Sequence, residues 1–117
     1  MSTLIENMQA VLAPLAAGGA WYAVNSVEPP VYPYIVFQRI ISPTNNTLLG
    51  ASDVQNTIIQ IDIYSNLISE AATLAVTLAS ALAAAPFTAI QQSSQDLYEP
   101  DVKAHRVSSD WSCWSAN

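Results

Sequence analysis

The fold of this chain is decided by two stretches, YPYIVFQ at residues 32–38 and QIDIYS at residues 60–65. Six of the eight residues at 34–41 are β-branched or aromatic, and the stretch is bounded by prolines, which favours a strand over a buried helix of the same length. In residues 57–65, isoleucines alternate with polar residues, the pattern of a strand with one buried face and one wetter face. Both stretches therefore predict core strands.

The interval between the two strands, residues 42–56, is polar and long enough for an extended hairpin loop. Leu48 and Leu49 lie at its centre. In one interpretation, this pair orders on a partner protein. In the other, the loop folds back and the two leucines cover the core.

A helix is predicted on each side of the strand pair. Thr3 and Glu6 fit a capping box, so the first helix should begin near Leu4. The second should follow Asn66 as its N-cap and end before Pro86. Its apolar stripe consists of Ala71, Leu74, Ala75, Leu78 and Leu82.

The remaining segments read as strands. Residues 21–24 predict a short strand, and residues 87–114 predict two strands around a turn at 97–101. Helices and strands are segregated along the chain, which is typical of the α+β class. We therefore expect a single domain over residues 1–117, with an antiparallel or mixed sheet of about four to five strands, two helices packed on one face and a long hairpin loop at 42–56.

Composition limits the classes of partner. Three basic residues stand against nine acidic ones, a net charge of −6, so no basic stripe is available for direct nucleic-acid binding. With 51% hydrophobic and 10% charged residues, part of the surface should meet protein. Cys113 is the one cysteine, which suits a reducing site of synthesis. We expect no signal peptide and no membrane span.

Candidate catalytic and metal-ligating residues are few. His105 and Cys113 are the only histidine and cysteine, too few for a zinc site within one chain. The carboxylates between Asp96 and Asp101 lack the regular spacing of a calcium loop and predict a solvated acidic turn. A serine near His105 lacks a sharp nucleophile turn. We therefore expect no enzyme activity, no catalytic or metal site, and no cofactor.

Trp111 and Trp114 are three residues apart, so on a continuous strand they point to opposite faces. The outward ring is then a candidate interface anchor, because tryptophan is enriched at binding hot spots. The alternative is a strand that ends before Trp114, with both rings packed on the domain. The candidate interface residues are therefore Leu48, Leu49, Trp111 and Trp114.

The order of these features resembles the tail-completion, or tail-terminator, proteins of long-tailed bacteriophages. The resemblance covers roughly residues 3–114 and starts with the N-terminal helix. It continues through YPY at 32–34, QIDI at 60–63, SEA at 69–71 and HRV at 105–107. Residues 42–56 and the serine-rich end follow no pattern that can be matched to the family.

The resemblance implies a structural protein that forms a ring, commonly a hexamer. The ring would cap the tail tube, end its polymerisation and form the joint to the head connector. Its partners would be other copies of itself, the tail-tube protein and a head-completion or connector protein, with DNA passing through without direct binding. It would reach the tail-neck junction of the virion after synthesis in the host cytoplasm. Two alternatives stay open: another neck or head-tail joining protein, and a small non-viral α+β adaptor.

Overall fold

The computed structural model describes residues 4–24, 30–41, 46–47, 50–51, 54–101 and 103–116. Its helical elements are α1 (Leu4–Leu12), the short 3-10 turn η1 (Ala13–Leu15) and α2 (Ile68–Ala83). Its strands are β1 (Ala20–Tyr22), β2 (Tyr34–Ile41), β3 (Asn46–Thr47), β4 (Gly50–Ala51), β5 (Val54–Ser65), β6 (Thr88–Glu99) and β7 (Ala104–Ala116). Within these residues, neither helix is long and apolar enough to cross a membrane.

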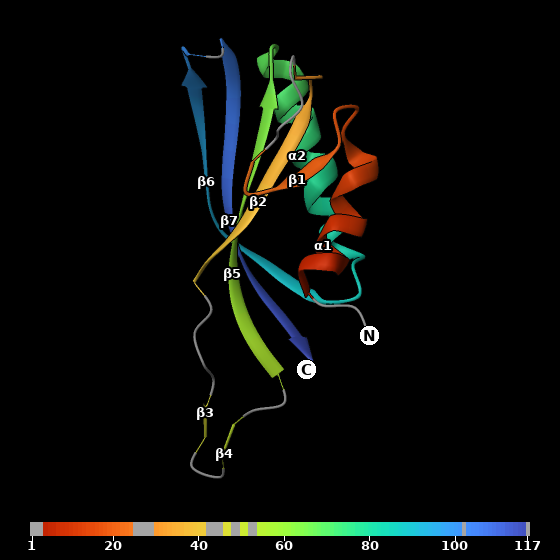
Figure 1. The fold of residues 1–117 in the computed structure, drawn as a ribbon, viewed down its shortest axis with the longest axis vertical. Helices are drawn as coiled ribbons and strands as arrows, with labels where there is room; N and C mark the ends of the chain where they lie inside the picture. The colour runs from red at the N-terminus through yellow and green to blue at the C-terminus, as the bar shows by residue number, and fades with distance from the viewer. Residues whose placement is uncertain are drawn as a thin grey trace.

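Five strands form one mixed sheet in the order β1-β2-β5-β7-β6 (Figure 1). β1 runs parallel to β2, and every other neighbouring pair is antiparallel. β3 and β4 pair with each other, apart from this sheet, between β2 and β5 in the chain. The expected α+β class is confirmed, with a five-stranded mixed sheet.

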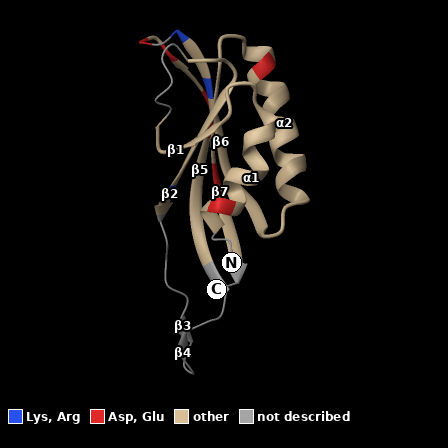
Figure 2. Ribbon diagram, turned by 45° about the vertical axis from the view of Figure 1, so that its right-hand side comes forward, with Lys and Arg blue, Asp and Glu red and all other residues tan. Residues whose placement is uncertain are grey.

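One face of the sheet carries the core. The register places Ile35 opposite Ile63 and Phe37 opposite Ile61, so these four side chains share a face, and all four are buried. Both helices contribute to the same hydrophobic cluster through Met8, Leu12, Ala71, Leu74, Leu78 and Leu82. Figure 2 shows α1 and α2 on the same side of the sheet.

Gly18 fixes the entry into β1. Its N–H donates to the carbonyl of Pro33 at 2.8 Å, which holds the start of β1 beside β2. A Cβ at this position would lie 1.9 Å from the carbonyl oxygen of Val31. Only glycine allows the two backbone segments to approach so closely.

α2 begins differently from the sequence prediction. Its N-cap is Leu67, in an extended conformation and without a side-chain cap, so the prediction of Asn66 was wrong. The serine at the end of β5 instead links the N-cap residue to the first turn: Ser65 Oγ accepts from the N–H of Leu67 at 3.1 Å and donates to Glu70 Oε1 at 2.6 Å. Ser65 is fully buried, whereas Glu70 is partly exposed, so the link is shielded from water at its serine end.

The ends of three strands refine the predicted boundaries. β2 spans residues 34–41 as expected, and the predicted short strand is present as β1, over residues 20–22 rather than 21–24. β5 begins at Val54 rather than Thr57, because Val54 pairs with Ala116 of the long strand β7. The last three residues of the expected 42–56 loop therefore belong to the sheet. β6 likewise continues through Glu99, so residues 97–99 are strand and not turn.

Candidate functional site

The face of the sheet away from the core is polar and not covered by a helix (Figure 2). On β5 and β7 it consists of the residues that alternate with the core positions, and the register pairs Asn56 with Trp114 and Asp62 with Ser108. Asn56 Nδ2 donates to Ser112 Oγ at 2.7 Å, so short polar side chains bond one another across the strands. We call this surface the open face.

Arg106 ties three strands together on the open face. From β7, its Nη2 lies 3.1 Å from Asp62 Oδ2 on β5 and its Nη1 lies 2.8 Å from Glu99 Oε1 on β6. Burial alone lowers the pKa of Arg106, but the Glu99 hydrogen bond and the Asp62 charge outweigh it and raise the pKa. Gln60 Nε2 donates to Asp62 as well, at 3.2 Å and 3.3 Å. The buried Asp62 carboxylate is therefore held by two donors.

Aromatic rings continue this arrangement toward β2. The rings of Tyr34 and Tyr64 are stacked, with centroids 4.8 Å apart and planes inclined by 14°. The Arg106 guanidinium lies over the Tyr64 ring, 5.9 Å from its centroid, and the ring centroids of Tyr32 and Tyr34 are 5.5 Å apart. Burial is the main cause that raises the pKa of Tyr34 to about 12. Both stacked tyrosines therefore stay neutral at ordinary pH.

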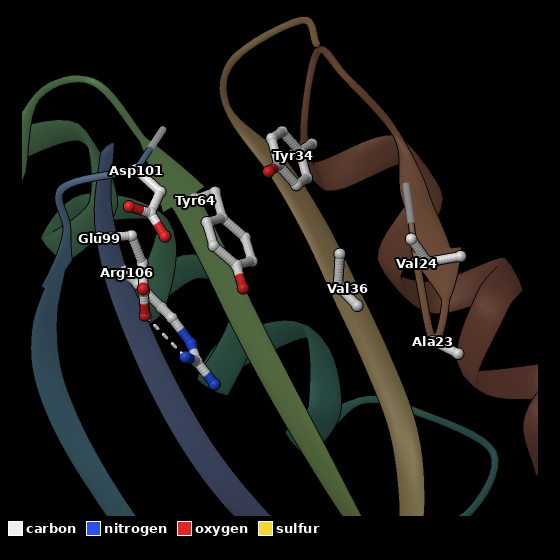
Figure 3. A pocket seen from close by; sticks show the side chains of 8 residues that line it. All are labelled: Ala23, Val24, Tyr34, Val36, Tyr64, Glu99, Asp101 and Arg106. Atoms are coloured by element: carbon white, nitrogen blue, oxygen red, sulfur yellow. Dashed lines mark hydrogen bonds and ion pairs between the residues drawn. The ribbon is translucent and has the colours of Figure 1, made fainter. Parts of the chain in front are cut away.

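A hollow of about 330 Å³ opens beside these groups (Figure 3). Ala23 and Val24, from the segment after β1, form one wall, and Tyr64 and Arg106 lie on the opposite side. The full lining is Ala23, Val24, Tyr34, Val36, Tyr64, Glu99, Asp101 and Arg106. The lining combines three apolar side chains with two tyrosines, two carboxylates and one guanidinium.

The two candidate tryptophans point to opposite faces, as their spacing predicts. β7 runs unbroken through both, so the alternative of a strand that ends before Trp114 was wrong. Trp111 pairs with Ile59, is 5% exposed, and donates from Nε1 to Ser109 Oγ at 2.9 Å inside the core. Trp114 pairs with Asn56 on the open face and is half-buried. The outward ring of the pair is therefore Trp114.

Leu48 and Leu49 lie outside the described residues. The flanking strands β3 and β4 are paired, with Asn46 opposite Ala51 and Thr47 opposite Gly50. Both interpretations of the leucine pair therefore stay predictions.

The acidic residues do not converge on one point. Register places Glu99 on the Arg106 side of β6, whereas Asp96 pairs with Val107 and faces the core side. Within the described residues, no group of three or more His, Cys, Asp or Glu side chains is placed to hold a metal ion.

Sequence reasoning missed the Arg106 network and the tyrosine stack. The alternation on residues 57–65 predicts only that Asp62 and Tyr64 share the wetter face of their strand, and no local pattern connects them to Arg106 in the HRV motif. The signal that could have joined them is the alternation on residues 60–65 and 105–114. It places all three on one face once the two strands are paired.

Comparison with protein families matches residues 6–115 of the 117 to the family described as Tail completion protein gp17. Comparison with individual curated proteins finds no match. The match covers nearly the whole chain and includes every strand of the five-stranded sheet except the last residue of β7. The chain therefore belongs to the tail completion protein gp17 family, structural proteins of bacteriophages.

Proposed function

We propose that the chain is a tail terminator: it closes into a ring, caps the tail tube, ends tube polymerisation and forms the joint to the head connector at the tail-neck junction. The observation that carries this proposal is the family match over residues 6–115. A protein that completes a tail has to bind the end of a growing tube, because further subunits would otherwise add there.

The shape of the sheet supports a ring. A ring forms from head-to-tail contacts, which need two different patches on each subunit. The five-stranded sheet has two different edges, a three-residue strand β1 on one side and the twelve-residue strand β6 on the other. These edges are candidates for the two patches.

Charge and the aromatic residues of the open face support the proposed partners. The net charge of −6 repels phosphates, so DNA can pass a ring of such subunits without adhering to it. Trp114 offers an outward aromatic anchor for the tail-tube protein or the head connector.

The experiment that tests the proposal measures tube length. Tail-tube protein is polymerised with increasing amounts of the chain, and the tubes are measured by electron microscopy. The mean length should fall as the ratio of chain to tube protein rises, because each capped end stops growing. Tube lengths that do not respond at any ratio would overturn the terminator function, and another role in the neck would then explain the family membership better.

Replacement of Trp114 by alanine should weaken capping while the subunit stays folded. The ring is half-buried on the open face and outside the core cluster, so its loss removes contact area without opening the core. Tube length at a fixed ratio measures capping, and circular dichroism with thermal unfolding measures folding. Trp114→Phe is the matched control and should retain part of the effect. Full capping by a folded Trp114→Ala protein would exclude this residue from the interface.

A further inference from the structure

The outer edge of β6 is open along a long strand. β6 is the last strand of the sheet and pairs only with β7. Its residues 90–96 are all exposed. Edge strands are usually protected by lysine, proline or a covering segment, and residues 88–99 contain neither lysine, arginine nor proline. Its protective features are a bulge between Gln91 and Ser93 and two carboxylates, Asp96 and Glu99, of which Glu99 is already paired with Arg106. The edge is therefore suited to pairing with another strand.

A second open edge lies on the opposite side of the sheet. β1 pairs with β2 only over residues 35–37. The continuation of β2, residues 38–41, has no strand partner on that side among the described residues. The N–H of Arg39 reaches only the Tyr22 hydroxyl, at 3.4 Å. A strand from another molecule can therefore pair with this part of β2.

The directions of β6 and β2 allow these two edges to pair between copies that are related by rotation around a ring. β2 is antiparallel to β5, β5 to β7 and β7 to β6, so β6 runs opposite to β2. Rotation around a ring axis leaves the direction of each strand along that axis the same in every copy. β6 of one copy then meets β2 of the next copy in the antiparallel sense, in a contact that repeats head to tail.

Charges on the two edges are complementary. Asp96 on β6 pairs with Val107, and Arg39 on β2 pairs with Ile59, so both lie on the helix side of the sheet. Both side chains are exposed, and neither forms an ion pair within the described residues. The other arginine, Arg106, is already held by two carboxylates. Arg39 is thus a cation of this chain that is available to Asp96 of a neighbour.

We propose that the outer edge of β6 pairs with residues 38–41 of β2 in a second copy, with Asp96 facing Arg39 of that copy. The proposal rests on the proposed ring and names the contact that builds it. The joined sheets then form one continuous sheet around the ring. Oppositely charged cross-strand neighbours stabilise such a pairing, and like charges destabilise it.

Charge exchange tests the pairing. Asp96→Arg and Arg39→Asp should each weaken self-association, measured by sedimentation, by about 2- to 5-fold per contact, because each places like charges opposite one another. The double variant should recover most of the loss. The matched control, Lys103→Asp, makes the same charge change as Arg39→Asp at an exposed residue beyond the end of β6 and outside the hollow, and should leave association unchanged. Additive losses in the double variant would overturn the proposed register.

Disulfide trapping tests the geometry directly. Directly opposed residues in antiparallel strands have Cα atoms about 4.5–5.5 Å apart, within the range that a disulfide bridges. Under mild oxidation, a protein with both Asp96→Cys and Arg39→Cys should form covalent chains longer than a dimer, whereas each single variant should not. The native Cys113 does not interfere, because it is fully buried and burial raises its pKa to about 12.

The remaining outcomes separate this contact from the proposed function. Rapid dimers from Asp96→Cys alone would show a two-fold contact between two β6 strands and overturn the head-to-tail pairing. A ring by native mass that gives no cross-linked chains would overturn the pairing and leave the terminator function standing. A monomer that neither assembles nor cross-links, with or without tail-tube protein, would contradict both.

Discussion

The two faces of the sheet use the same strands for opposite purposes. On β5, Ile61 is completely buried against the helices, while its neighbour Gln60 lies on the open face among polar side chains. Substitutions of the buried side chains on the core face should be costly, because these side chains pack closely against both helices. The open face is held by hydrogen bonds, one ion-pair network and stacked tyrosines, and has no helix above it. Stability thus comes mainly from one face, and the other is available for partners.

The sharpest test of this contrast compares adjacent residues. Ile61→Ala should lower the free energy of unfolding by about 2–5 kcal/mol, because it leaves a cavity in a closed core. Gln60→Ala should cost about 0.5–1.5 kcal/mol, the value of its hydrogen bonds to Asp62 and Ser108. Urea unfolding at one protein concentration measures both. Equal losses from the two variants would show that the open face contributes to stability as much as the core does.

The Arg106 network should give an intermediate effect. Arg106→Leu removes two ion pairs and leaves the buried Asp62 with Gln60 as its remaining side-chain donor. We expect a loss of about 1–3 kcal/mol in the free energy of unfolding.

The control for the network removes the Asp62 charge that Arg106→Leu leaves without its ion-pair partner. Asp62→Asn added to Arg106→Leu should recover part of the loss, since no unpaired carboxylate remains. Glu99 is more exposed than Asp62, so Glu99→Gln should cost less than Arg106→Leu. A folded Arg106→Leu protein as stable as the parent would show that the network does not hold the three strands together.

The smallest expected effect appears at alkaline pH. Burial raises the pKa of Tyr34 from 10.0 to about 12, so the neutral form is favoured in the folded state. The contribution of neutral Tyr34 to the free energy of unfolding is fully present below pH 10 and is lost as the pH rises through about 12. The reason is that the tyrosine releases its proton at a lower pH in the unfolded chain than in the folded protein. Thermal unfolding as a function of pH should show this decline, and Tyr34→Phe should reduce it. An identical decline in the Phe variant would assign the effect to other groups.

Much of the fold was predictable because its signals are local. The alternation on residues 57–65 predicted both faces of β5, and the stripe from Ala71 to Leu82 predicted the buried side of α2. The spacing of Trp111 and Trp114 also predicted their opposite faces. These features depend only on the periods of strand and helix.

The site was harder to predict because it depends on pairing between distant strands. Arg106 meets Asp62 only because residues 44 positions apart fall in adjacent register. The start of α2 at Leu67, next to Ser65, and the early start of β5 likewise depend on the way the chain is arranged around them, which local patterns do not carry. The pairing of β5 with β7 also decides which of the two tryptophans faces outward.

The native mass of the purified chain over a concentration series, with and without tail-tube protein, tests the central claim most directly. The account predicts a discrete closed assembly, or growth toward one when tail-tube protein is added, because two different sheet edges allow head-to-tail contacts that close. A monomer that persists at every concentration and ignores tail-tube protein would contradict it, and so would a two-fold dimer that grows no further.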